Sequence, residues 1–154
     1  MNNIGIPAKF GILIALGLIV YFLALSLVGL HTNPVFSFIN CAIMAFGIWT
    51  AIKAKRNNNS ELFKYSEGFT TGLITGFVAT TLFTIFFGIY ASELNPDFLD
   101  QFLTKWRSQY QAGLGAVLFS VYAMGAATTF ALTLTFMQLF KKSWNTKKAE
   151  KHTV

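Results

Sequence analysis

Charged side chains are scarce in this protein. Aspartate, glutamate, lysine and arginine make up 12% of its 154 residues, whereas a soluble domain contains about 25%. Four long uncharged runs account for the shortage, and hydrophobic residues reach 54% of the chain. This distribution excludes an ordinary soluble domain and predicts a single four-helix transmembrane domain over residues 1–154.

Cysteine and histidine are also rare, which excludes several kinds of membrane protein. Cys41 is the only cysteine, so a thiol oxidoreductase lacks its second thiol, and we expect Cys41 to be a small packing residue. His31 and His152 fall outside the uncharged runs, whereas a membrane haem needs histidines within its spans. A metal site or an intramembrane protease lacks ligands and bases for the same reason. We therefore expect no enzyme, no cofactor and no catalytic, cofactor-binding or metal-binding residue.

No predicted span carries a charged residue in its middle. Glu67 and Glu93 stand at opposite ends of the third run, whereas ion-coupled transport usually places a carboxylate or a base inside the bilayer. A threonine hydroxyl can satisfy itself by bonding to a carbonyl oxygen in the preceding turn of its own helix. We therefore expect the residues that carry hydroxyls at depth to serve in packing between helices. Asn40 is expected to face a neighbouring helix. The polar groups at depth are Asn40, Thr75, Thr80, Thr81, Thr84, Ser120, Thr128, Thr129 and Thr133.

The four uncharged runs predict transmembrane helices at about 10–30, 35–52, 68–92 and 114–140. A helix rises 1.5 Å per residue, so about 20 residues cross the hydrocarbon core. The first run is longer than the apolar region of a signal peptide, which favours a retained span. Asn33 with Pro34 is expected to start the second helix, and Ser66 to cap the third. The predicted fold class is all-α, with four transmembrane helices in two hairpins.

The distribution of cations predicts the orientation. With both termini on one side, ten basic residues share that side and only Lys105 and Arg107 lie on the other. The positive-inside rule then predicts a multi-pass protein of the bacterial inner membrane, with both termini and the 141–154 tail cytoplasmic. The net charge of +6 is explained by this orientation, so nucleic acid is not an expected partner. The ten residues are Lys9, Lys53, Lys55, Arg56, Lys64, Lys141, Lys142, Lys147, Lys148 and Lys151.

A stripe of small residues follows one face of the third span. Residues four apart share a helix face, and small side chains let helix backbones approach closely in lipid. The alternative explanation is that glycine is common in any membrane helix. The predicted helix-packing residues are Gly68, Gly72, Gly76, Thr80, Thr84 and Gly88, with Ser92 continuing the spacing. The small residues expected to meet them from the fourth span are Gly115, Ala116, Ser120, Ala123, Ala127, Ala131 and Thr135.

A short amphipathic helix is predicted between the third and fourth spans, over about 96–112. It is too short and too charged to cross the membrane, and it is expected to lie on the outer side with its aromatic face buried in the interface. A short helix that packs over the ends of the bundle remains an equal alternative. We also expect that the aromatic face docks on a partner, with burial at the lipid surface as the alternative. The aromatic residues recur every four positions, at Phe98, Phe102, Trp106 and Tyr110.

Several segments together resemble a known family. The sequence FKYSEGFTTG, the small-residue third span, the sequence NPDFLDQF and the lysine tail are similar to the domain-of-unknown-function 4199 family. Its members are small four-span inner-membrane proteins, found mainly in Bacteroidota. The resemblance covers most of the chain and is best from Phe63 to the C-terminus. It implies the four-helix topology, and it implies neither an activity nor any functional residue.

The sequence therefore predicts a non-catalytic integral membrane protein that serves as an accessory or scaffolding subunit of a larger inner-membrane assembly. The alternative is a small transporter or channel subunit that acts as a homo-oligomer. The expected partners are the lipid bilayer and either other integral membrane subunits or further copies of the same chain. No small-molecule substrate can be identified from the residues.

Overall fold

Four long helices form the part of the chain that the structure, a computed structural model, describes: residues 5–29, 34–58, 64–94 and 113–140. They are α1 (Gly5–Val28), α2 (Ser37–Asn58), α3 (Tyr65–Ile89) and α5 (Leu114–Phe140). These described residues include no strand. Each helix is long and apolar enough to cross a membrane, so the chain is a multi-pass membrane protein. The prediction of four span-length helices is confirmed.

The helices begin and end at points that the uncharged runs do not mark. Helix α1 begins at Gly5 and includes Pro7, because a proline in the first turn gives up no helical hydrogen bond. Helix α3 begins at Tyr65, with the extended backbone of Lys64 at its N-cap and no side chain capping it. The prediction that Ser66 caps this helix is therefore wrong. A short 3₁₀ turn, η1 (Pro34–Phe36), precedes α2, and Asn33 lies outside the described residues.

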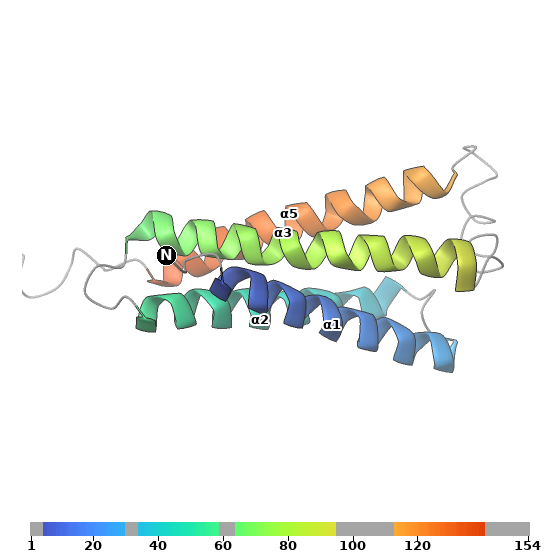
Figure 1. The fold of residues 1–154 in the computed structure, drawn as a ribbon, viewed down its shortest axis with the longest axis horizontal. Coiled ribbons are helices and arrows are strands. Elements are labelled where there is room, and N and C mark those ends of the chain that lie inside the picture. The colour runs from blue at the N-terminus through green and yellow to red at the C-terminus, as the bar shows by residue number, and fades with distance from the viewer. Residues whose placement is uncertain (1–4, 30–33, 59–63, 95–112, 141–154) are drawn as a thin grey trace, which may run out of the picture.

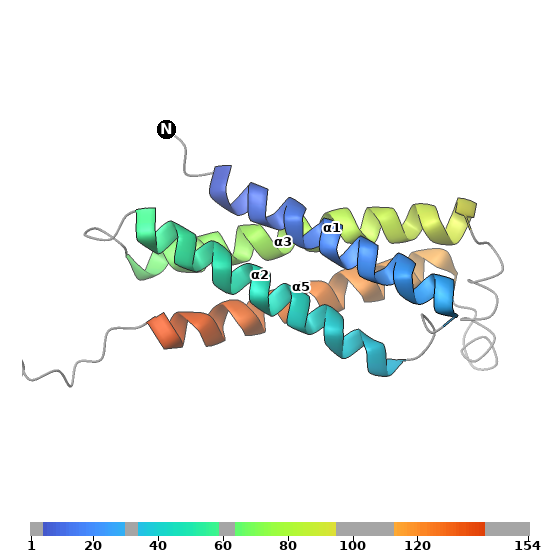
Figure 2. The ribbon, with the colours of Figure 1, turned by 90° about the horizontal axis from the view of Figure 1, so that it is seen from below.

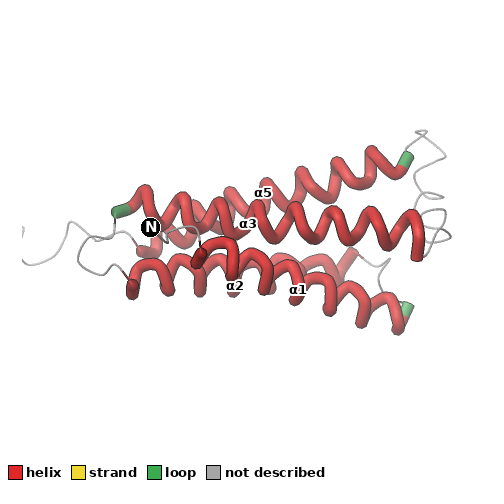
Figure 3. Tube along the Cα trace, in the orientation of Figure 1, coloured by secondary structure: helices red, strands yellow, loops and turns green. Residues whose placement is uncertain are grey.

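Helix α3 lies at the centre of the structure. It packs against α1 on one side and α5 on the other, while α2 packs against α1 and α3 and meets α5. Figure 2 shows the same four helices from below, where α1 crosses α3 and α2 crosses α5. The trace in Figure 3 shows that helix makes up nearly all of the described chain. Because α3 touches every other helix, changes to its surface affect the whole structure.

Two buried clusters hold the helices together. The first cluster consists of Ile14, Leu18, Met44, Ile48, Ile52, Ala79 and Met137. The second consists of Phe22, Phe87, Tyr90, Ala91 and Val117. In the second cluster the ring of Phe22 meets that of Tyr90 edge-on, with 4.9 Å between their centroids, the arrangement that aromatic rings prefer.

A π-helical turn, η2 (Tyr90–Leu94), follows α3 directly. Its first residue, Tyr90, is buried, and its hydroxyl lies 2.5 Å from the Ser26 hydroxyl of α1. The Ser92 hydroxyl bonds back to the Gly88 carbonyl oxygen at 2.9 Å. The contact between the Tyr90 and Ser26 hydroxyls ties the end of α3 to the end of α1.

Candidate helix-packing interface

The predicted stripe of small residues on α3 lies toward the interior. Gly68, Gly72, Gly76 and Thr80 are buried, while Thr84 and Gly88 are half-buried. The buried positions therefore occupy the half of the stripe that is nearer the start of α3. The residues that face them on α5 show how closely the two helices approach.

Glycine on one helix faces threonine on the other along the α3–α5 contact. A β-carbon at Gly72 would lie 2.6 Å from Cγ2 of Thr133, and one at Gly76 would overlap the side chain of Thr129. Ordinary van der Waals contact begins near 3.4 Å, so neither position admits even a methyl group without movement. The two helices approach closely here because glycine has no side chain.

At the next contact the threonine lies on α3 and the glycine lies on α5. Thr80 of α3 faces Gly125 of α5, where a β-carbon would lie 2.5 Å from Cγ2 of Thr80. Further along α3, a β-carbon at Gly88 would lie 3.4 Å from both methyl carbons of Leu118. The tight part of the contact thus spans Gly72 to Thr80 and loosens toward the end of α3.

The residues of α5 that meet α3 are not the ones predicted. The buried residues of α5 are Val117, Thr129, Thr133 and Met137, and Gly125 lies between them on the same face. The seven small residues expected to meet α3 are all exposed, namely Gly115, Ala116, Ser120, Ala123, Ala127, Ala131 and Thr135. That prediction is wrong. Both sets recur at helical spacing, and apolarity alone does not tell a face that meets a helix from one that meets lipid.

Hydroxyl groups on α3 and α5 fall into two classes. Thr129 of α5 bonds to the Gly125 carbonyl oxygen one turn back, at 2.8 Å, and Thr128 and Ser120 bond in the same manner to Met124 and Ala116. Among the described residues, four threonine hydroxyls are buried without a hydrogen-bond partner, those of Thr75, Thr80, Thr84 and Thr133. The helices are therefore held at this contact by van der Waals packing rather than by interhelical hydrogen bonds.

Two further predicted residues can be placed on α2. Asn40 is half-buried, and its Oδ1 is buried without a hydrogen-bond partner among the described residues. Cys41 is exposed, so among the described helices it is not the packing residue that was expected.

The predicted docking face of the amphipathic helix cannot be placed in the same way. Phe98, Phe102, Trp106 and Tyr110 lie outside the described residues. Within 5–29, 34–58, 64–94 and 113–140, no group of three or more His, Cys, Asp or Glu side chains is arranged to hold a metal ion.

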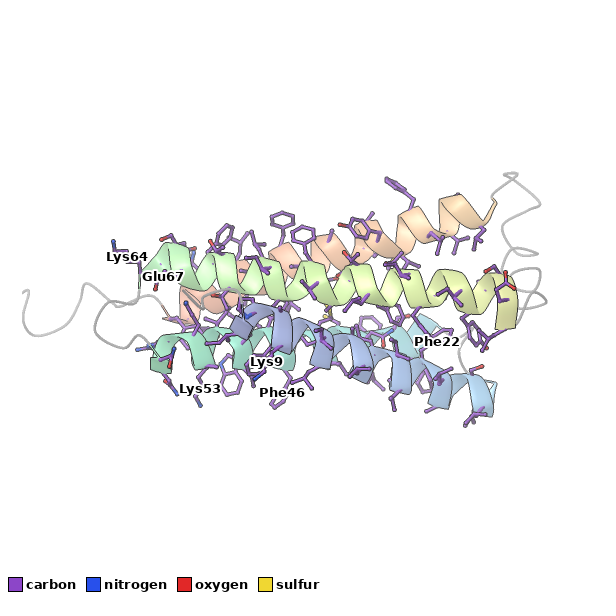
Figure 4. The ribbon with its side chains drawn as sticks, in the orientation of Figure 1. Lys9, Phe22, Phe46, Lys53, Lys64 and Glu67 are labelled. Carbon is purple, nitrogen blue, oxygen red and sulfur yellow. The ribbon has the colours of Figure 1, made fainter. Side chains whose placement is uncertain are left out.

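Cationic side chains gather where α2 ends and α3 begins. Figure 4 shows Lys53 and Lys64 toward this end of the molecule, with Glu67 beside Lys64. Arg56, near the end of α2, places its Cζ 5.5 Å from the ring centroid of Phe140, the last residue of α5. Lys55 is buried, with 4% of its surface exposed. This end of the structure is therefore strongly positive.

Comparison with known proteins identifies one family. A family model described as "Protein of unknown function (DUF4199)" matches residues 9–142. The match covers all four long helices except the first residues of α1. No curated protein and no solved structure matches the chain.

Proposed function

The chain belongs to the DUF4199 family of proteins of unknown function, and from this premise we propose that it is a non-catalytic accessory or scaffolding subunit of a larger inner-membrane assembly. The proposal places both termini in the cytoplasm, because ten of the twelve basic residues then lie inside. It arranges the first two spans as one hairpin and the last two as another. It assigns no catalytic role to any residue.

The outer face of α5 carries this proposal. Ala123, Ala127, Ala131 and Thr135 follow one another at intervals of four and are all exposed. On a helix they lie on the side opposite Gly125 and the threonines that meet α3. A lipid-facing helix gains nothing from small side chains, whereas a helix that meets another helix gains close backbone contact. A transmembrane helix of a partner subunit is the occupant that this face suits.

The polar groups on the same face need no partner to satisfy them. The Thr135 hydroxyl donates to the Ala131 carbonyl oxygen at 2.8 Å, and the Ser120 hydroxyl donates to the Ala116 carbonyl oxygen at 2.8 Å. A partner helix therefore meets this face through close packing alone, as the α3–α5 contact does within the chain. This similarity supports packing as the mode of assembly.

The proposal includes a second contact on the outer side of the membrane. The amphipathic segment over 96–112 is proposed to dock its aromatic residues on the outer surface of the partner. Asp97 and Asp100 balance Lys105 and Arg107 in this segment, so it has little electrostatic attraction to anionic lipid. Aromatic residues of this kind are enriched in protein interfaces.

A transporter or channel subunit that works as a homo-oligomer is the alternative. The same outer face of α5 would then meet a second copy of the chain. The two proposals differ in one observable, which is the identity of the protein bound at this face.

Purification in mild detergent followed by mass spectrometry tests the proposal. The wild-type protein is expected to retain foreign membrane subunits in stoichiometric amounts. Ala127→Leu and Ala131→Leu should release them, because a large side chain holds the partner backbone away. Ala24→Leu on α1 and Ala42→Leu on α2 make the same change at exposed positions elsewhere and should retain them. Recovery of the chain only with itself would favour the alternative.

The outer segment has a separate test in the same preparation. The double change Phe102→Ala and Trp106→Ala should release the foreign subunits while leaving membrane insertion intact. An unchanged set of bound proteins would show that this segment rests on lipid and takes no part in docking.

A further inference from the structure

An aromatic and cationic column runs along the outward face of α2. Phe46, Trp49, Lys53 and Arg56 are spaced by three, four and three residues, so they share one helix face. This face lies opposite the buried residues of α2, and Phe46 is 68% exposed. The ring centroids of Phe46 and Trp49 lie 6.3 Å apart. The column thus begins with apolar rings inside the span and ends with two cations at the end of the helix.

The two cations are held in place by aromatic rings. The Lys53 Nζ lies 4.9 Å from the ring centroid of Trp49 on the preceding turn. The guanidinium of Arg56 lies over Phe140 of α5, as described above. Residues three apart on a helix are neighbours, so Lys53 and Arg56 can reach one anion together. Figure 4 shows Lys53 and Phe46 along the same edge of the molecule.

The surroundings of the column are strongly positive. At this end of the structure the described residues carry one carboxylate, that of Glu67, and its Oε2 is buried without a hydrogen-bond partner among them. The described cations toward the same end are Lys9, Lys53, Lys55, Arg56 and Lys64. An anion is therefore attracted to this surface, and an ammonium group is repelled from it.

We propose that the face formed by Phe46, Trp49, Lys53 and Arg56 binds one anionic phospholipid. Its phosphate lies between Lys53 and Arg56, and an acyl chain lies along Phe46 and Trp49. The apolar half of the column is what selects a lipid, because a nucleic acid or an acidic peptide has nothing to place against rings within the span. A zwitterionic lipid offers the same phosphate but brings an ammonium group into a cationic surface. The site lies on α2 and does not depend on the partner face of α5.

Tryptophan fluorescence offers a local test, because Trp49 lies within the proposed site. Trp106→Phe and Trp144→Phe leave Trp49 as the sole tryptophan of the full-length chain. This protein is reconstituted into phosphatidylcholine vesicles that contain either brominated phosphatidylglycerol or brominated phosphatidylcholine, and quenching of Trp49 by bromine is measured. We expect phosphatidylglycerol to be favoured about thirtyfold at this position, as two surface cations would produce. Equal quenching by the two lipids would overturn the proposal.

Paired variants separate this site from general surface charge. Lys53→Gln with Arg56→Gln should abolish the preference for phosphatidylglycerol. Lys9→Gln with Lys64→Gln removes the same number of charges from the same end and should leave the preference nearly unchanged. Equal loss in both pairs would contradict a defined site. Retention of the preference in the first pair would also contradict it.

Two further controls complete the experiment. Lys53→Arg keeps the charge and should keep the preference, which separates loss of charge from loss of folding. Potassium phosphate should weaken the preference no more than potassium chloride of equal ionic strength. Selective displacement by phosphate would mean that the cations bind a free anion, and the lipid proposal would be wrong.

Discussion

Replacing Gly76 by alanine tests the α3–α5 contact most sharply. The added β-carbon would meet Cγ2, Oγ1 and Cβ of Thr129. A rotation about the Thr129 side chain moves the first two atoms, but the β-carbon is fixed to the backbone. The Thr129 hydroxyl is also bonded to the Gly125 carbonyl oxygen, so rotation would break that hydrogen bond. The clash can therefore be relieved only if the two helices move apart.

The expected change in the free energy of unfolding of Gly76→Ala combines two opposing effects. Overpacking of a tight contact costs about 1–3 kcal/mol, and a clash with a fixed β-carbon belongs at the upper end of that range. Alanine also favours a helix over glycine by about 1 kcal/mol. Gly115→Ala on α5 supplies the matched control, because a β-carbon there has no atom within 4 Å. The two alanine variants should thus differ in free energy of unfolding by about 2–3 kcal/mol, with Gly76→Ala the less stable.

Unfolding in mixed micelles of increasing dodecyl sulfate content, followed by circular dichroism, measures this difference. Gly115→Ala should be as stable as the wild type or slightly more stable. In a Thr129→Gly background the Gly76→Ala change should lose its cost, because the opposing β-carbon is gone. If Gly76→Ala were as stable as Gly115→Ala in the wild-type background, the close approach of these helices would be refuted.

Two other predictions concern the ends of the helices. Single cysteines at Asn58 and Gln109, in a Cys41→Ser background, should react with impermeant thiol reagents from opposite sides of the membrane, and labelling of both from the outer side would contradict the proposed topology. Tyr90→Phe should lower the free energy of unfolding by about 1 kcal/mol, because it removes the hydroxyl bonded to Ser26. In the double variant, Ser26→Ala should lower the free energy of unfolding little further than Tyr90→Phe does alone. Full additivity of the two changes in the same dodecyl sulfate titration would mean that the hydrogen bond between Tyr90 and Ser26 contributes nothing.

The four span-length helices could be predicted because charge must leave the hydrocarbon core. An uninterrupted apolar run marks a span whatever its neighbours are, so its existence is local information. The positions at which the helices end are not determined by the uncharged run alone. Helix α2 continues through Lys53 to Asn58, because backbone hydrogen bonds continue into water while the uncharged run does not.

The face that α5 turns toward α3 could not be predicted from the same information. In a soluble helix, polar residues mark the outer face, but lipid-facing and helix-facing residues are both apolar. Ala123, Ala127 and Ala131 form as regular a series as Gly125, Thr129 and Thr133 do. The only signal of the buried face was that Gly125 is followed at intervals of four by the β-branched Thr129 and Thr133, and this signal is weak. The turn at Tyr90 was missed for another reason, because its partner Ser26 lies 64 residues earlier in the chain.

The exposed face of α5 is the central claim of the proposed function, and cross-linking in native membranes tests it directly. A photoreactive side chain at Ala127 should give a discrete protein adduct whose mass differs from twice that of the chain. The same side chain at Ala42 of α2 should react only with lipid. An adduct of the chain with itself at Ala127 would favour the homo-oligomer over the accessory subunit. Reaction with lipid alone at both positions would contradict any partner at this face.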